Sequence, residues 1–198
     1  MDKGNMIILL DNGHGRETPG KRSPDGRLME WEYTRQLAAA IEARLLATGY
    51  NVRRIVEEAA DVPLRERCRR VNEVCRTHPH VLLISLHCNA AGNGSQWCEA
   101  RGWGAYVSLN ASENSKRLAK RLCEAAELFG QKLRRYAPGQ PWWVQNLAMC
   151  RDTKCPAVLT ENLFQDNRAD VDYLLSVEGK QALADLHVQG IADYIREL

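Results

Sequence analysis

The chain has 198 residues, of which 44% are apolar and 26% charged, as is typical of a soluble globular domain. Its formal net charge of +2 is too small to indicate nucleic acid as a partner. Seven cysteines without a CxxC pair argue against a disulfide framework and against a cysteine zinc site. No stretch reaches the ~18 apolar residues of a membrane span. We therefore expect a single globular domain over residues 1–198.

The N-terminus lacks the features of a secretory signal peptide. Residues 1–5 lead into an apolar stretch that is only a few residues long and has no small-residue cleavage site after it. The odd number of cysteines is explained most simply by free thiols in a reducing compartment. These observations predict a chain that is cytoplasmic as synthesised, unless a leader was trimmed from it.

The first half of the chain predicts three strands that alternate with two helices. The strands are expected at residues 6–10, 51–56 and 81–87, and the helices at residues 29–47 and 61–77. The first and third strands are continuous apolar runs, which is typical of strands buried on both faces of a sheet. The helices have apolar residues at helical spacing and are bounded by glycine or proline.

The second half continues this alternation. A strand is expected at residues 105–109, a helix at 112–129, a strand at 157–161 and two closing helices, the last at 180–197. Residues 135–146 contain two prolines and a glycine and are predicted to form a loop. The pattern predicts an α/β fold in which helices cover both faces of a twisted, mostly parallel central sheet of about six strands.

Three of the apolar runs end at residues that can bind a metal ion or transfer a proton. His14 follows the first run, His87 ends the third, and Glu161 ends the run that begins at residue 157. Because ligands gather at the carboxyl ends of parallel strands, we expect these side chains to face one crevice. A catalytic zinc ion usually has three protein ligands and one open position. Glu30 and Glu32 are both candidates for the third ligand, and periodicity does not choose between them.

The other three histidines lack this placement. His78 and His80 flank a proline in a turn, and His187 lies in the middle of a predicted helix. Isolated histidines of this kind are more often hydrogen-bonded or surface residues than ligands. We therefore leave them out of the predicted site.

The order and spacing of the motifs resemble those of the zinc-dependent type 3 N-acetylmuramoyl-L-alanine amidases, which cleave the lactyl amide bond of peptidoglycan. The resemblance covers nearly the whole chain. The matching segments are Leu10–Gly15, a glutamate about sixteen residues further on, Ser85–Ala90 and Pro156–Glu161, with additional matches at Pro63-Leu64, Arg67, Asn72 and Leu147–Arg151.

The resemblance implies a Zn²⁺ ion held by His14, Glu30 and His87, with Glu161 as the catalytic glutamate. It favours Glu30 over Glu32 because Thr34, four positions after Glu30, fits the family pattern. A second carboxylate across the crevice from the metal could take a proton from water and return it to the leaving amine.

The chain departs from the family pattern at several positions. Asn12 stands where the family usually has proline, and Arg16 where it often has glycine, so we expect a first loop of different shape. Cys88 replaces the commoner alanine and is expected to be a small buried residue. Residues 90–103 are too few for a long inhibitory helix, and we expect an uncovered site.

Four tryptophans lie in loops that are expected to border the crevice: Trp97, Trp103, Trp142 and Trp143. The pair Trp142–Trp143 is predicted to contact sugar rings or stem-peptide side chains, although packing over the core explains it equally well. Asn89 and Arg151 are further candidates for substrate binding. A structural salt bridge is an equal alternative for Arg151.

The predicted function is zinc-dependent hydrolysis of the amide bond between the lactyl group of N-acetylmuramic acid and L-alanine. The alternatives are a zinc peptidase or deacylase acting on another amide, and a wall-binding module with a degenerate site. A wall hydrolase without a signal peptide and without wall-binding repeats resembles a phage or prophage endolysin, which acts on the cell wall after release. A secreted autolysin trimmed of its leader would have the same sequence. We expect a monomer whose partner is peptidoglycan or a muropeptide.

Overall fold

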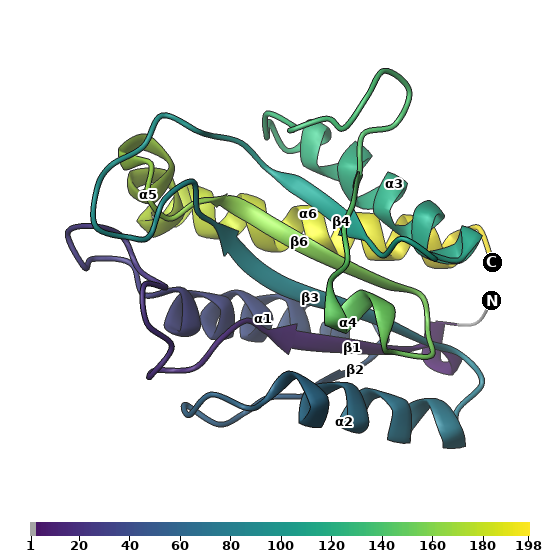
Figure 1. Cartoon of the computed structure of the whole chain (residues 1–198). Helices are drawn as coiled ribbons and strands as arrows, with labels where there is room; N and C mark the ends of the chain where they lie inside the picture. The colour runs from purple at the N-terminus through teal and green to yellow at the C-terminus, as the bar shows by residue number, and fades with distance from the viewer. Residues whose placement is uncertain (1–2) are drawn as a thin grey trace.

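A computed structural model describes residues 3–198, and a six-stranded sheet forms its centre (Figure 1). The strands are β1 (Ile7–Asn12), β2 (Asn51–Arg54), β3 (Val81–Asn89), β4 (Gly104–Val107), β5 (Trp143–Val144) and β6 (Ala157–Phe164). Their order across the sheet is β2-β1-β3-β6-β4-β5. All neighbouring strands are parallel except β4 and β6, which are antiparallel. The predicted mostly parallel sheet of about six strands is confirmed.

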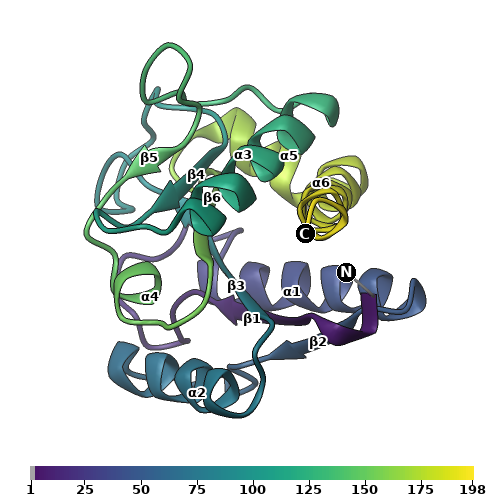
Figure 2. The ribbon, with the colours of Figure 1, turned by 90° about the vertical axis from the view of Figure 1, so that its right-hand side faces the viewer.

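Helices cover both faces of this sheet, as the sequence predicts. They are the 3-10 helix η1 (Lys3–Asn5) and the α-helices α1 (Glu30–Ala47), α2 (Leu64–Thr77), α3 (Glu113–Leu128), α4 (Ala148–Arg151), α5 (Arg168–Leu175) and α6 (Val177–Arg196). Figure 2 shows α1, α3 and α6 on one face and α2 and α4 on the other. None of the helices within residues 3–198 is long and apolar enough to cross a membrane.

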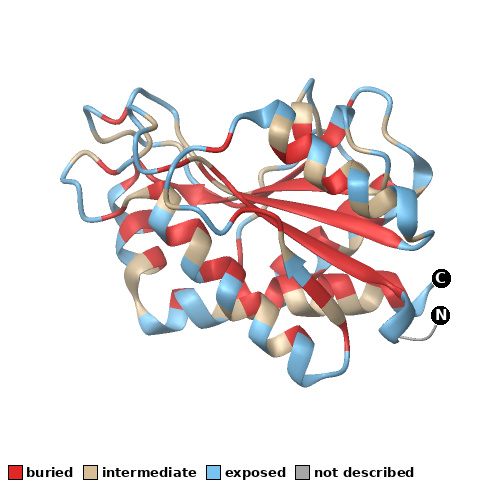
Figure 3. Ribbon diagram, turned by 90° about the horizontal axis from the view of Figure 1, so that it is seen from below, coloured by how far each residue is buried: buried red, intermediate tan, exposed pale blue. Residues whose placement is uncertain are grey.

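The two faces of the sheet contribute to two separate apolar clusters. In β1, Ile8 and Leu10 pack in the larger cluster with α1, α3 and α6, whereas Ile7 and Leu9 pack in the smaller cluster with α2 and α4. Successive side chains of a strand point to opposite faces, so both sets of positions must be apolar. Figure 3 shows the central strands buried along most of their length. This burial explains why the strands read as continuous apolar runs in the sequence.

Two of the loop predictions were wrong. The predicted loop at residues 135–146 contains strand β5, in which Trp143 pairs with Tyr106 of β4. A strand of two residues is too short to produce a periodic signal, and the prolines before it dominate the pattern. Trp103 does not border the crevice, because its side chain is completely buried and its indole Nε1 donates to Asn162 Oδ1 at 2.9 Å.

Candidate active site

The carboxyl ends of β1 and β3 and the start of α1 bring three potential metal ligands together. Single donor atoms of His14, Glu30 and His87 all lie within 4.8 Å of one another. Glu30 Oε1 is 3.1 Å from His87 Nδ1 and 3.4 Å from His14 Nε2. The two imidazole rings meet edge to face, with 4.9 Å between their centroids. Within residues 3–198 this is the one group of histidine, cysteine and acidic side chains with such spacing.

The fold separates the two glutamates that the sequence pattern could not distinguish. Glu30 is completely buried between the two histidines, whereas Glu32 is exposed. Two positions along a helix correspond to a rotation of roughly 200°, so the two side chains point in nearly opposite directions. The backbone N–H of Cys88 also donates to Glu30 Oε1, at 3.0 Å, and fixes that carboxylate against β3.

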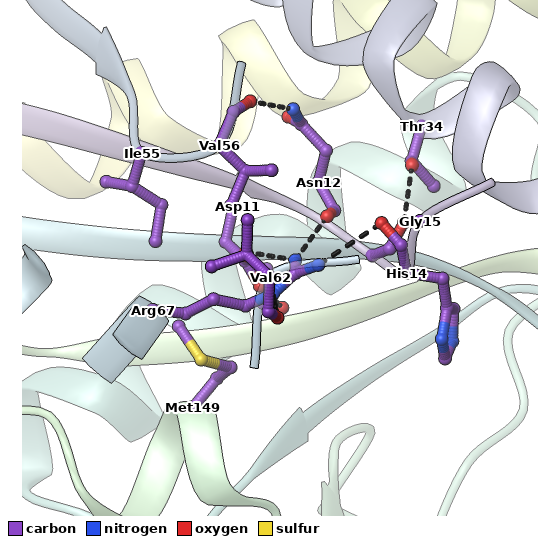
Figure 4. Close-up of polar contacts among 12 residues, drawn as sticks. Asp11, Asn12, His14, Gly15, Thr34, Ile55, Val56, Val62, Arg67 and Met149 are labelled. Atoms are coloured by element: carbon purple, nitrogen blue, oxygen red, sulfur yellow. Dashed lines mark hydrogen bonds and ion pairs between the residues drawn. The ribbon is translucent and has the colours of Figure 1, made fainter. Parts of the chain in front are cut away.

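The loop that carries His14 is held through its backbone carbonyls (Figure 4). The buried guanidinium of Arg67, on α2, donates to Asn12 O and to His14 O and forms an ion pair with the carboxylate of Asp11 at 2.8 Å. On the other side, the Thr34 hydroxyl donates to Gly13 O at 3.2 Å. The imidazole of His14 points away from Arg67. These contacts give a physical reason for the family pattern at Arg67 and at Thr34.

The glycines beside His14 are required by close packing. A Cβ atom on Gly13 would lie 2.5 Å from the ring of His87, and one on Gly15 would lie 2.1 Å from the backbone of Asp61. The left-handed backbone conformation falls on His14 itself, with φ of 60°. Residues with a side chain rarely adopt this conformation unless the surrounding structure enforces it, as the carbonyl contacts of this loop do.

The three side chains perturb one another electrostatically. Burial lowers the pKa of His14 to about 4 and keeps this imidazole neutral at physiological pH. Burial acts in the same direction on His87, but the hydrogen bond and negative charge of Glu30 outweigh it, and the pKa of His87 is raised. Burial works to raise the pKa of Glu30, yet His87, His14 and Lys21 outweigh burial and the pKa is lowered. Glu30 is therefore ionised beside at least one neutral imidazole.

Glu161 lies directly opposite His87 in the register of β3 and β6. Paired residues of neighbouring strands project from the same face, so the carboxyl of Glu161 is on the side of the sheet that carries His87. Burial raises the pKa of Glu161 to about 7. A carboxyl group with this pKa can accept and return a proton near neutral pH.

The residues of this cluster fit a zinc ion. Glu30 Oε2 and Glu161 Oε2 are both buried and have no hydrogen-bond partner within the described chain. Buried carboxylate oxygens usually have hydrogen-bond partners in folded proteins, so these two oxygens are available to coordinate a cation or contact a ligand. Two imidazole nitrogens and one carboxylate oxygen are also a donor set that catalytic zinc commonly uses.

Comparison with known proteins identifies the family of the chain. The sequence model of the Amidase_3 family, described as N-acetylmuramoyl-L-alanine amidase, matches residues 8–193. The chain belongs to this family of type 3 amidases.

Individual relatives are similar to parts or nearly all of this chain. An endolysin of Bacillus phage SPP1 is 27% identical over 192 residues, which are 96% of this chain and 66% of the relative. The amidase AmiC of Neisseria meningitidis is 34% identical over 114 residues, 58% of this chain and 25% of the relative. The matched part of the chain thus spans about two thirds of the length of the endolysin and one quarter of the length of AmiC. The crystal structure of the amidase Ami1 from Mycobacterium smegmatis has the same fold, with a TM-score of 0.84 at 21% identity over 100% of both chains.

The departures of this chain from the family pattern have local explanations. Asn12, at the position of the usual proline, donates from its side-chain nitrogen to Val56 O at 2.6 Å and ties the end of β1 to the segment after β2. Cys88 is buried, and burial raises the pKa of its thiol well above the usual range. It is therefore a protonated core residue. Residues 90–103 contain no helix, as expected for an uncovered site.

The structure brings two of the predicted substrate-binding residues, Asn89 and Trp143, to Tyr106 and leaves Arg151 apart from them. Asn89 lies two residues after His87 and donates to the Tyr106 hydroxyl at 3.4 Å. Trp142 and Trp143 are half-buried, and Trp143 stacks on Tyr106 with 6.1 Å between ring centroids. Arg151 bonds to its neighbour Asp152 and to Asn146. It lines a hollow that shares no residue with the 210 Å³ hollow beside His14 and His87.

Two cations near the site were missed by the sequence analysis. Lys21, in the loop after β1, and Arg134, in the loop after α3, both act to lower the pKa of Glu161. Neither residue follows a strand end or belongs to a periodic pattern. No sequence signal marked them, because long-range folding alone places their loops beside β6.

Proposed function

We propose that this chain is a zinc-dependent N-acetylmuramoyl-L-alanine amidase. It hydrolyses the amide bond between the lactyl group of N-acetylmuramic acid and the L-alanine of the peptidoglycan stem peptide. The observation that carries the proposal is the convergence of His14, Glu30 and His87 beside the buried carboxyl group of Glu161. The family membership supports it independently.

His14, Glu30 and His87 are the proposed zinc ligands. One carboxylate and two imidazoles leave a divalent cation with a net positive charge. When bound, zinc supplies the Lewis acidity that polarises the amide carbonyl and acidifies a water molecule. Arg67 and Thr34 orient the loop of His14, and the backbone of Cys88 orients Glu30.

Glu161 is the proposed general base and general acid. Its carboxylate takes a proton from the attacking water as the new bond to the lactyl carbonyl carbon forms. It returns this proton to the alanine nitrogen as the carbon–nitrogen bond breaks. The products are a free lactyl carboxyl group and a stem peptide with an N-terminal alanine. A pKa near 7 suits both transfers, since each requires the other protonation state.

The substrate contacts extend the proposal beyond the reacting atoms. Asn89 and the pair Trp142–Trp143 lie on or next to the elements that carry His87 and Tyr106, and we propose that they contact the muropeptide. Arg151 stays a prediction, because its hydrogen bonds to Asp152 and Asn146 favour the structural alternative. The setting of a phage or prophage endolysin is supported by the similarity to an endolysin.

Product analysis tests the proposal. The purified protein should contain one zinc ion per chain. When it is incubated with peptidoglycan, it should release stem peptides that begin with L-alanine. Mass spectrometry should find glycan strands with intact lactyl groups. New reducing sugars without new alanine N-termini would refute the amidase assignment. New amino groups deeper in the stem peptide would favour the zinc peptidase. Binding of the protein to the cell wall without any hydrolysis would favour the degenerate wall-binding module.

The role of Glu161 requires a separate experiment. Glu161→Gln should keep its zinc and its affinity for wall fragments but lose turnover by a factor on the order of 10²–10⁴, the scale of a general acid–base group. Glu32→Gln is the matched control, because it makes the same chemical change at an exposed position of the same region. Full activity in Glu161→Gln would remove this residue from the mechanism and leave the product assignment standing.

A further inference from the structure

Arg134 presents a cation that forms no ion pair within residues 3–198, on the face of the sheet that carries Glu161. Its backbone N–H donates to Trp103 O at 2.8 Å, and its carbonyl accepts from Trp143 Nε1 at 2.6 Å. The guanidinium lies over the rings of Trp143 and Phe164, at 5.2 and 5.0 Å from their centroids. Anchored backbone and aromatic contacts on two sides hold this side chain in place.

The register of the sheet connects Arg134 to the proposed reaction centre. Gly104 of β4 pairs with Glu161 of β6, and Tyr106, two residues further on, projects from the same face. The Tyr106 ring leans over Gly104, where a Cβ atom would lie 3.2 Å from the ring. The Tyr106 hydroxyl accepts from Arg134 Nη1 at 3.1 Å and from Asn89 Nδ2 at 3.4 Å.

Among the described residues, most of the N–H donors of the Arg134 side chain have no hydrogen-bond acceptor and are available to a ligand. A guanidinium has five N–H groups, and the hydrogen bond to Tyr106 uses one. No carboxylate of residues 3–198 forms an ion pair with Arg134, although the residue is half-buried. Its neighbour Arg135 is exposed and forms an ion pair with Glu127. The guanidinium of Arg135 is therefore already paired with a carboxylate, whereas that of Arg134 is available to bind an anion.

We propose that Arg134, together with Tyr106 and Asn89, forms a subsite for the free α-carboxylate of the second stem-peptide residue. This inference rests on the proposed function. The stem peptide continues from L-alanine to a D-glutamate linked through its γ-carboxyl group, so the α-carboxyl is the first anionic group after the cleaved bond. A planar guanidinium binds a carboxylate through two parallel hydrogen bonds. Amidation of that carboxyl removes the charge and one of the two acceptors.

The chemical prediction is a preference for the non-amidated stem peptide. Two muramoyl tetrapeptides that differ only in this group, D-isoglutamate or D-isoglutamine, are compared by kcat/KM. The wild type should prefer the carboxylate by about 10- to 100-fold, the scale of a hydrogen bond to a charged group. Arg134→Gln should lose this preference through slower cleavage of the carboxylate substrate, with its zinc content unchanged. Arg135→Gln is the matched control and should keep the preference.

A binding measurement separates this inference from the proposed function. Calorimetry with the dipeptides L-Ala-D-isoGlu and L-Ala-D-isoGln requires no turnover. The wild type should bind the carboxylate dipeptide more tightly, and Arg134→Gln should bind both alike. Equal binding by the wild type, or a preference that persists in Arg134→Gln, overturns the subsite. Failure to cleave either tetrapeptide would instead count against the amidase. If Arg134→Gln does not fold, Arg134→Lys keeps the charge without the planar fork and should show a reduced preference.

Discussion

Two histidine clusters lie on opposite faces of the sheet, and they differ in whether their polar atoms have partners. His87 and Glu161 project from the face that α2 and α4 cover in part. Thr160, next to Glu161, projects from the other face and contacts His187 of α6. The side chain of His87 is 16% exposed, whereas His187 is completely buried. One strand, β6, thus supports both a structural cluster and the proposed active site.

The cluster around His187 is fully satisfied. His187 Nδ1 lies 2.7 Å from the carbonyl of Leu183 and must carry the proton, because a carbonyl can only accept. Nε2 is then the acceptor for the Thr160 hydroxyl at 3.0 Å. Burial lowers the pKa of His187 to about 4, so this imidazole is neutral at physiological pH. A buried histidine with both nitrogens matched serves the packing of α6 against β6.

The cluster around His87 is not satisfied by the protein. Glu30 Oε2 and Glu161 Oε2 have no partner within residues 3–198, and the His14 backbone has an unfavourable positive φ. Features of this kind gather at functional sites, where the ligand supplies the missing interaction. Completeness of hydrogen bonding therefore distinguishes the two clusters better than residue type does.

Asn162 connects the two clusters. Its side-chain nitrogen donates to the carbonyl of His87 at 3.0 Å, and it also lies 3.3 Å from the Thr160 hydroxyl oxygen. Its side-chain oxygen accepts from the buried indole of Trp103. Thr160 and Asn162 flank Glu161 along β6, so the satisfied network fixes the strand segment from which the catalytic candidate projects.

The sharpest test of this comparison makes the same substitution, histidine to alanine, in each of the two clusters. His87→Ala should lose most bound zinc and nearly all turnover but stay folded, because this side chain is partly exposed. His187→Ala should keep its zinc and lose about 2–4 kcal/mol of unfolding free energy, since it leaves a cavity and two unmatched polar groups. Elemental analysis and denaturant unfolding measure the two effects. Zinc loss in His187→Ala alone would reverse the assignment.

Arg67 offers a test in which stability and metal binding should change together. Arg67→Leu removes the buried ion pair with Asp11 and the donors to the loop of His14, and should cost about 3–5 kcal/mol of stability. Zinc affinity should fall by about 10- to 100-fold, as for other residues that orient metal ligands. Arg67→Lys should recover part of the stability but little of the affinity, because it lacks the planar fork. Unchanged zinc affinity in Arg67→Leu would exclude this positioning role.

The third test concerns the pH dependence of stability. The pKa of His187 is about 4 in the folded chain and 6.5 for an unperturbed histidine, so between these values the unfolded chain binds the extra proton. Stability from this residue is complete above pH 6.5 and is lost as the pH falls to 4. The amount is on the order of 3 kcal/mol, from a pKa difference of about 2.5.

The comparison with His187→Gln isolates this contribution. Both proteins are unfolded with urea at several pH values in the presence of a chelator, so that titration of His14, Glu30 and His87 is common to both. The stability difference between wild type and variant should shrink steadily from pH 6.5 to pH 4. A constant difference over this range would show that His187 does not titrate as its burial predicts.

Much of the fold and of the candidate site could be predicted from the sequence. The apolar runs before His14, His87 and Glu161 predicted buried strands, because residues buried on both faces of a sheet must be apolar throughout. His14 follows β1 as expected, whereas β3 continues past His87 to Asn89 and β6 continues past Glu161 to Phe164. Strand β5 could not be predicted, since Trp143–Val144 forms a strand only by pairing with β4. Trp103 was misplaced because its hydrogen bond to Asn162 depends on a residue far away in the chain.

The sequence by itself determined which residue types stand at the strand ends and, through the order of its motifs, the family to which the chain belongs. The tertiary structure decided between Glu30 and Glu32, because only the path of α1 relative to β3 sets which carboxylate meets both imidazoles. It also brought Arg134 to Tyr106, on the face of the sheet that carries Glu161. Local patterns encode burial and chain direction, whereas the partners of a polar side chain are set by segments that meet only when the chain folds.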